Sequence, residues 1–156
     1  MAPAAVSRRL PLGVDDAFAL VTDPGAHARW IPLTAVSTDG PLRAGGRVVG
    51  VTGPFAGRGH GLVDRMVVDR VDPPGGAART AVYRKVGPVL LGEARLEVRA
   101  DGDGSTVTWV EDVHLARGPR RLTAALLRPA FVVMTWWALR HAAADARRAT
   151  NRRASV

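Results

Sequence analysis

The feature that most constrains the fold is a change of character at about residue 116. From residue 33 to 115 the chain consists of short segments with strand character, separated by turns rich in glycine, proline and aspartate. Connections this short favour antiparallel neighbours in one sheet. From Pro119 onward the pattern instead predicts one long helix, in which Pro129 can introduce a kink. The six predicted strands are 33–39, 46–52, 61–71, 78–86, 91–100 and 105–115.

Three further elements are predicted before this sheet. Residues 4–10 predict a first strand, and residues 14–21 predict a short helix. A second short helix begins with Asp23 as N-cap and Pro24 at the first helical position, and it ends near Trp30. A sheet with one apolar face needs a second layer, and the long helix is the only element large enough to supply it. The sequence therefore predicts an α+β fold with a six- to seven-stranded antiparallel sheet.

The face of the long helix that meets the sheet follows from its 3.6-residue period. Two neighbouring tryptophans cannot both point the same way, so Trp136 replaces Trp137 on this face if Pro129 shifts the register. The residues predicted to share the inner face are Leu127, Ala130, Met134, Trp137, His141 and Ala144.

The size and composition of the chain indicate a single soluble domain. It has 156 residues, of which 47% are apolar, and no cysteine, which excludes disulfides, thiolate metal sites and a cysteine nucleophile. We expect one domain over 1–149, followed by a basic, flexible tail over 150–156. No signal peptide is recognisable, and the uncharged run 129–139 is shorter than the ~20 residues that span a bilayer. A cytoplasmic location is expected by default.

The positive charge is confined to one part of the chain. The net charge is +8, yet residues 1–116 contain 13 basic and 13 acidic residues. The excess lies in residues 117–156, where nine arginines accompany a single acid, Asp145. The positive charge of the helix can favour contact with an anionic membrane surface. Nucleic-acid binding is disfavoured, because no recognisable binding motif accompanies the arginines.

Four local patterns, in order along the chain, resemble the helix-grip superfamily. This group includes START domains, pollen-allergen-like proteins and the polyketide cyclase/dehydratase-like SRPBCC proteins. The resemblance covers about residues 4–148. The patterns are Asp23-Pro24 with Arg29-Trp30-Ile31-Pro32, then Leu42-Arg-Ala-Gly-Gly-Arg47, then Val71-Asp-Pro-Pro74, and finally Gly104-Ser-Thr-Val-Thr-Trp-Val-Glu111.

The resemblance implies a curved sheet that wraps the C-terminal helix and encloses an apolar cavity. Members bind lipids, sterols, polyketides or other hydrophobic molecules, and some catalyse ring closure and dehydration. The resemblance implies a cavity more strongly than it implies a reaction.

Glu111 is the first candidate for chemistry. Trp109 and Glu111 are two residues apart in a strand, so both point to the face that carries Val107 and Val113. Desolvation in an apolar cavity would raise the pKa of Glu111 and suit it to general acid or base catalysis. The alternative is a structural ion pair with an arginine across the sheet or at the cavity mouth.

Two further residues are candidates for proton transfer. His141 follows Trp137 by one helical turn and could orient a ligand carbonyl, or it could be a helix-end histidine near solvent. Tyr83 could offer its phenol to an enol or carbonyl, or it could be an amphipathic residue of the rim. We expect His27 and His114 to face solvent.

The segment 53–61 is predicted to be a flexible hairpin at the cavity mouth. Its glycine spacing is followed by a strand and not by a helix, so it is not a dinucleotide fingerprint. Here Arg58 could meet a carboxylate or phosphate. No cofactor is expected, and the scattered histidines have no metal-ligand spacing. The predicted ligand contacts are Trp30, Phe55, Arg58, His60, Trp109, Met134 and Trp137.

Two functions remain open from the sequence. The first is a protein that binds a hydrophobic polyketide-, lipid- or quinone-like molecule and catalyses cyclisation or dehydration through Glu111, Tyr83 or His141. The second is a non-enzymatic carrier that touches anionic membranes through its basic C-terminal helix. The sequence leaves a monomer and a homodimer equally open.

Overall fold

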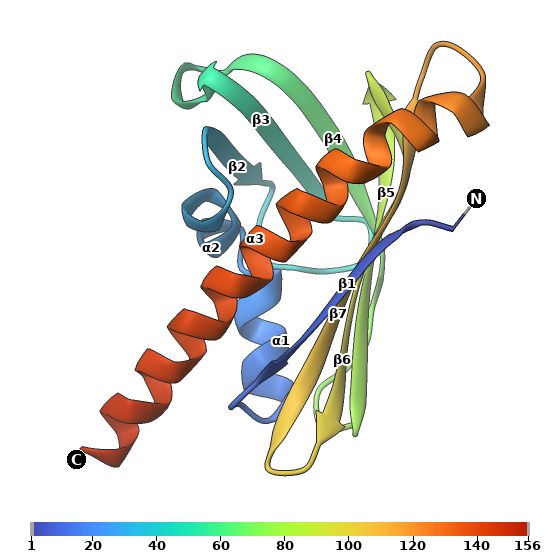
Figure 1. Ribbon diagram of the computed structural model, residues 1–156. Coiled ribbons are helices and arrows are strands. Elements are labelled where there is room, and N and C mark those ends of the chain that lie inside the picture. The colour runs from blue at the N-terminus through green and yellow to red at the C-terminus, as the bar shows by residue number, and fades with distance from the viewer. Residues whose placement is uncertain (1, 156) are drawn as a thin grey trace.

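Seven strands form one antiparallel sheet in the computed structural model, which describes residues 2–155. The sheet curls around one face of a long C-terminal helix, α3 (Figure 1). The predicted helix-grip α+β fold is confirmed. The strands are β1 (Ala4–Leu10), β2 (Thr34–Thr38), β3 (Arg47–Phe55), β4 (His60–Val71), β5 (Ala78–Pro88), β6 (Leu90–Asp101) and β7 (Gly104–Leu115). The helices are α1 (Val14–Thr22), α2 (Pro24–Trp30) and α3 (Arg120–Ala154), with a 3₁₀ turn, η1 (Ala56–Arg58), between β3 and β4.

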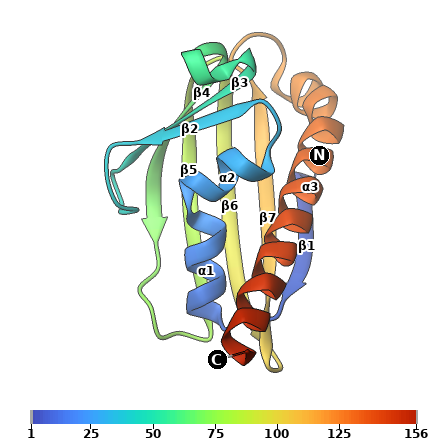
Figure 2. The same ribbon diagram turned by 90° about the vertical axis from the view of Figure 1, so that its left-hand side faces the viewer.

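The strand order is β1-β7-β6-β5-β4-β3-β2. Five hairpins join consecutive strands from β2 to β7, as the short glycine- and proline-rich turns predict. The first strand departs from this pattern, because it pairs with the last, with Ala4 opposite Glu111. The helices α1 and α2 carry the chain from one edge of the sheet to the other. They lie with α3 on the concave face (Figure 2).

The N-terminus of α2 is stabilised by the predicted cap. The carboxylate of Asp23 accepts hydrogen bonds from the backbone N–H groups of Gly25 at 3.2 Å and Ala26 at 3.0 Å. Pro24 occupies the first helical turn, where its missing N–H would have no partner. The cap fixes where α2 leaves α1 and so sets the position of His27 on the concave side.

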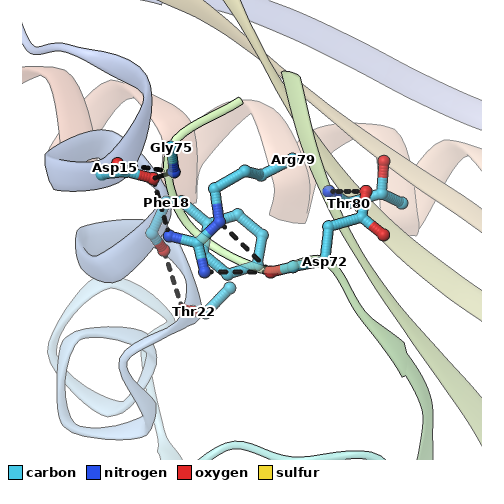
Figure 3. Close-up of polar contacts among 7 residues, drawn as sticks. All are labelled: Asp15, Phe18, Thr22, Asp72, Gly75, Arg79 and Thr80. Carbon is cyan, nitrogen blue, oxygen red and sulfur yellow. Dashed lines mark hydrogen bonds and ion pairs between the residues drawn. The ribbon is translucent and has the colours of Figure 1, made fainter. Parts of the chain in front are cut away.

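Arg79 of β5 joins α1 to the sheet (Figure 3). Its Nη1 donates to Asp15 Oδ1 at 3.0 Å, and its guanidinium lies over the Phe18 ring at 3.9 Å. The same guanidinium donates to the Asp72 carbonyl oxygen from Nε and Nη2. The side chain is only 12% exposed. One residue therefore connects α1, β5 and the β4–β5 turn.

The buried face of α3 differs from the predicted one. Small residues face the sheet, whereas Trp136 and Trp137 are 40% and 42% exposed. Alanine lets the helix approach the sheet closely, and the large side chains of the apolar sequence then lie elsewhere. Because apolar residues occupy several faces of this helix, the 3.6-residue pattern did not fix its phase. The buried residues of α3 are Thr123, Thr135, Ala138, Leu139, Ala142, Ala143 and Ala146.

The last turns of α3 also differ from the prediction. The helix extends beyond Ala149 to Ala154. Thr150 Oγ1 donates to the Pro11 carbonyl at 3.1 Å, and Arg153 pairs with Asp16 at 2.9 Å. These contacts with the β1–α1 region support the added turn.

The solid core fills only one end of the concave side. It lies where α1 and the C-terminal half of α3 meet the sheet, around Phe18, Val21, Leu139 and Val107. Toward α2 and β2–β4 the same face lines a cavity.

Candidate functional site

A cavity of ≈ 240 Å³ lies between the concave face of the sheet and the helices α2 and α3. From α3 only Phe131 and Met134 contribute to its wall. The mostly apolar wall predicts a ligand of the same character, held by a few polar groups. The apolar lining comprises Ile31, Val36, Leu42, Val48, Met66, Val68, Leu96, Phe131 and Met134.

Exposed polar residues on the β2–β3 side mark the mouth of the cavity. Asp39, Arg43 and Arg47 all line it and are exposed to solvent. Asp39 Oδ1 accepts from the backbone N–H of Arg47 at 3.0 Å and from Arg43 Nη1 at 3.4 Å. The Asp39 carboxylate thus links the two ends of the loop between β2 and β3, and the guanidinium groups of Arg43 and Arg47 lie beside the opening.

Three ionisable side chains meet inside the cavity. Lys85 on β5 contacts Asp64 Oδ2 on β4, and its Nζ lies 3.7 Å from Glu111 Oε2 on β7. The Lys85 and Glu111 side chains are each 3% exposed. Trp109 Nε1 donates to Glu111 Oε1 at 2.9 Å, which leaves Glu111 Oε2 without a hydrogen-bond partner among residues 2–155.

The strand register explains how these groups meet. Glu111 stands opposite Ala94, and Ala94 stands opposite Tyr83. Tyr83 and Lys85 are two apart on β5 and share a face. The small side chain of Ala94 leaves space across β6, so groups from β5 and β7 border one volume.

Burial dominates the electrostatics of Glu111. Desolvation raises the pKa of its carboxyl above the ordinary value, and Lys85 and the Trp109 N–H offset only part of this. For Lys85, burial lowers the pKa, but Glu111 and Asp64 together outweigh burial and raise it. Lys85 is therefore an ammonium ion that faces two carboxyl groups, and burial favours the protonated form of Glu111.

His27 and Tyr83 complete the polar set. His27 Nε2 donates to the Val21 carbonyl at 2.6 Å, and its ring stacks on Trp109 with 5.1 Å between centroids. Burial lowers the pKa of His27 although the Val21 carbonyl and Asp23 act against it, so the ring is neutral at pH 7. Burial raises the pKa of Tyr83, which keeps its phenol protonated.

The structure brings together four of the predicted site residues and separates the others. Glu111, Tyr83, Trp109 and Met134 line the cavity. Its lining does not include Trp30, Phe55, Arg58, His60, Trp137 or His141.

Each separated residue has a distinct surrounding. Trp30 is buried and donates from Nε1 to Asp145 at 2.9 Å. No residue of the 53–61 hairpin lines the cavity, and Phe55 is 60% exposed. The ring of His141 lies 5.2 Å from that of Trp137, on a side of α3 away from the wall. Neither Trp136 nor Trp137 faces the cavity.

Sequence reasoning missed Asp64, Lys85 and His27. A signal was present for Lys85, which is the sole lysine beside 21 arginines and shares strand parity with Tyr83. His27 was expected in solvent, and this was wrong, because α2 turns it onto Trp109. The expected ion pair of Glu111 with an arginine is formed with Lys85 instead. Among residues 2–155, no cluster of three or more His, Asp or Glu side chains suits a metal ion.

The family model described as "polyketide cyclase / dehydrase and lipid transport" matches residues 1–147. The chain belongs to this polyketide cyclase/dehydrase family. The resemblance drawn from the four sequence patterns is thereby confirmed. No match to a curated protein was found.

Solved structures share the fold of this family member at low sequence identity. TTHA0849 from Thermus thermophilus superposes with a TM-score of 0.65 at 11% identity, over 94% of this chain and 98% of that one. The di-domain ARO/CYC StfQ from the steffimycin biosynthetic pathway gives 0.65 at 15% identity, over 99% of this chain and 53% of StfQ. The Aha1 dimer from Colwellia psychrerythraea gives 0.56 at 10%, over 87% of this chain and 92% of that one. At these identities the likeness establishes the fold alone.

Proposed function

We propose that this polyketide cyclase/dehydrase family member binds a hydrophobic, polyketide-like molecule in the cavity and catalyses its cyclisation or dehydration. The observation that carries the proposal is Glu111, a buried carboxyl whose Oε2 has no hydrogen-bond partner among residues 2–155 and borders an apolar volume. A carboxyl of raised pKa in such a place can deliver a proton to a ligand oxygen at neutral pH.

The shape of the cavity would contribute first, by orienting the ligand. An apolar wall that confines a flexible chain brings its reacting carbons together, and this can replace much of the entropy cost of ring closure. In an aldol closure, the neutral imidazole of His27 would accept a proton from the carbon next to a carbonyl group. The carbon of the resulting enolate then bonds to a second carbonyl carbon, whose oxygen takes the proton of Glu111.

Lys85 would stabilise negative charge in the site and would not act as a nucleophile. Its raised pKa keeps it as an ammonium ion, so it cannot form a Schiff base at neutral pH. At 3.7 Å from Glu111 Oε2, it stabilises the carboxylate left after proton transfer. Before a dehydration, His27 would release its proton and Glu111 would regain one, which restores both groups. Glu111 would then protonate the hydroxyl that leaves as water, while His27 takes the proton from the carbon next to the carbonyl group.

Glu111→Gln tests the proposal. The amide keeps the size of the side chain and accepts from Trp109, but it has no acidic proton. We expect the dehydration of a bicyclic aromatic β-hydroxy ketone, followed by absorbance, to slow by about 10²–10⁴-fold. The dissociation constant for the same ketone should change less than about threefold.

Asp112→Asn is the matched control, because Asp112 is the exposed neighbour of opposite strand parity, paired with Arg120 at 3.3 Å. It should leave turnover unchanged. Equal turnover in Glu111→Gln and the parent protein would remove Glu111 as the acid.

A non-enzymatic carrier is the second candidate. The observation in its favour is that Lys85 is held between two carboxylates, an arrangement that can serve structure alone. A carrier would bind the ketone tightly and show no turnover in either protein. Its contact with a membrane was expected through the basic C-terminal helix, in whose last turns two arginines are engaged, Arg148 with Asp145 and Arg153 with Asp16.

A further inference from the structure

The first half of α3 exposes large apolar side chains to solvent. Leu122, Leu126 and Val133 are 58%, 70% and 64% exposed, and Trp136 and Trp137 are 40% and 42% exposed. Leu126 follows Leu122 by four residues, and Val133 follows Leu126 by seven. Trp136 and Trp137 follow Val133 by three and four residues, so all five side chains lie along one side of the helix. At ~1.5 Å per residue the row is about 22 Å long. We call these five residues the outer stripe.

The outer stripe inverts the usual pattern of a surface helix, which turns polar residues outward. An 18-residue window of α3 has a mean hydropathy of 1.5, is apolar and long enough to cross a membrane, and is only 22% buried. The helix is nevertheless part of the fold, because Phe131 and Met134 form the cavity wall and Thr135 and Ala138 are buried. Such a face calls for a partner outside the domain.

Charges beside the outer stripe select the kind of partner. Between Asp112 and Asp145 the chain has five arginines and no acid. Arg120 pairs with Asp112, whereas the other four, at 117, 121, 128 and 140, form no ion pair within the described residues 2–155. Arg140 lies in line with the outer stripe, its guanidinium 5.5 Å from the Trp136 ring centroid. Exposed tryptophans with flanking arginines suit the interface of an anionic bilayer.

A second copy of the chain fits this face less well. Antiparallel pairing of two outer stripes about residues 129–130 would bring Arg140 of one helix near Arg120 and Arg121 of the other. No acid between 113 and 144 is there to neutralise them. An anionic lipid surface offers many negative groups and accepts both the apolar row and its arginines.

We infer that the outer stripe docks the protein on an anionic bilayer, with α3 lying along the interface. The inference is independent of what the cavity binds or catalyses. It also narrows the membrane contact from the basic C-terminal helix as a whole to the apolar first half of that helix.

Vesicle sedimentation of the full chain tests the inference. Phosphatidylglycerol–phosphatidylcholine vesicles should bind the protein at least tenfold more strongly than phosphatidylcholine alone, and salt should weaken the binding. The Trp136→Ser/Trp137→Ser variant should lose at least tenfold in partition, with its melting temperature held within a few degrees. Tryptophan emission should shift to the blue on binding in the parent protein, since Trp30 and Trp109 are already buried.

Two charge variants of one helix give the matched control. Arg128→Gln/Arg140→Gln should weaken binding, and Arg147→Gln/Arg152→Gln, with the same change in net charge, should weaken it much less. Absence of binding to anionic vesicles would overturn the inference. So would equal losses in the two charge variants, or a dimer in light scattering that dissociates when the tryptophans are replaced.

Discussion

The one lysine of the chain, which also has 21 arginines, occupies a buried position. Lys85 lies between Asp64 on the adjacent strand β4 and Glu111 on β7, across β6, where a compact ammonium can approach both carboxyl groups. A guanidinium is planar and larger, so an arginine would need more space across Ala94. At this scale the site consists of the Lys85 ammonium between Asp64 and Glu111, and burial favours the protonated form of Glu111 at the cavity.

The pH dependence of stability follows from the raised pKa of Glu111. Its carboxyl carries a proton in the folded state at pH values where the unfolded chain, with a pKa near 4.5, has lost it. This contribution to stability is complete below pH 4.5 and is lost as the pH rises through the folded-state pKa. Glu111→Gln should therefore match the parent protein below pH 4.5 and become relatively more stable at higher pH.

Urea unfolding of both proteins from pH 4 to 8 measures this difference. His27, whose pKa is lowered, has the opposite sign, since its contribution is lost as the pH falls below 6.5. That term is common to both proteins and cancels in the difference. A difference that is constant with pH would contradict the raised pKa of Glu111.

The elements were predictable where the signal is local. Strand limits agree with the prediction to within a few residues, because Gly, Pro and Asp turns end strands wherever they fold. The inward side of β7 was also predictable, since Trp109 and Glu111 obey a period of two. The face of α3 was not, because large apolar residues such as Leu126 and Trp136 lie outward.

Arg79 joins α1 to the sheet through polar contacts and through the Phe18 ring. Arg79→Ala removes the ion pair with Asp15, the contact with Phe18 and two hydrogen bonds to Asp72. We expect a loss of about 2–3 kcal/mol in the free energy of unfolding, measured by urea titration. Arg99→Ala, at a side chain that is 72% exposed, should cost less than about 0.5 kcal/mol. Equal effects would show that Arg79 does not hold α1.

The whole molecule places its solid core at one end of the concave face and a cavity at the other. The meeting of Asp64, Lys85 and Glu111 depends on the registers of β4 with β5, β5 with β6 and β6 with β7. Such cross-strand distances are not readable from a single sequence. The mouth was misplaced for a similar reason, because hairpin 53–61 and the loop with Arg43 carry the same glycine and arginine signals.

Native mass spectrometry with fused-ring aromatic ketones tests the central claim, that this cavity is a small-molecule site. The parent protein should form a 1:1 complex. Ala94→Phe, which fills the cavity between Tyr83 and Glu111, should lose that complex at an unchanged fold; Val36→Trp on β2 serves if the first variant fails to fold. No complex in the parent protein, or equal complexes in the parent and the filled variant, would contradict the claim.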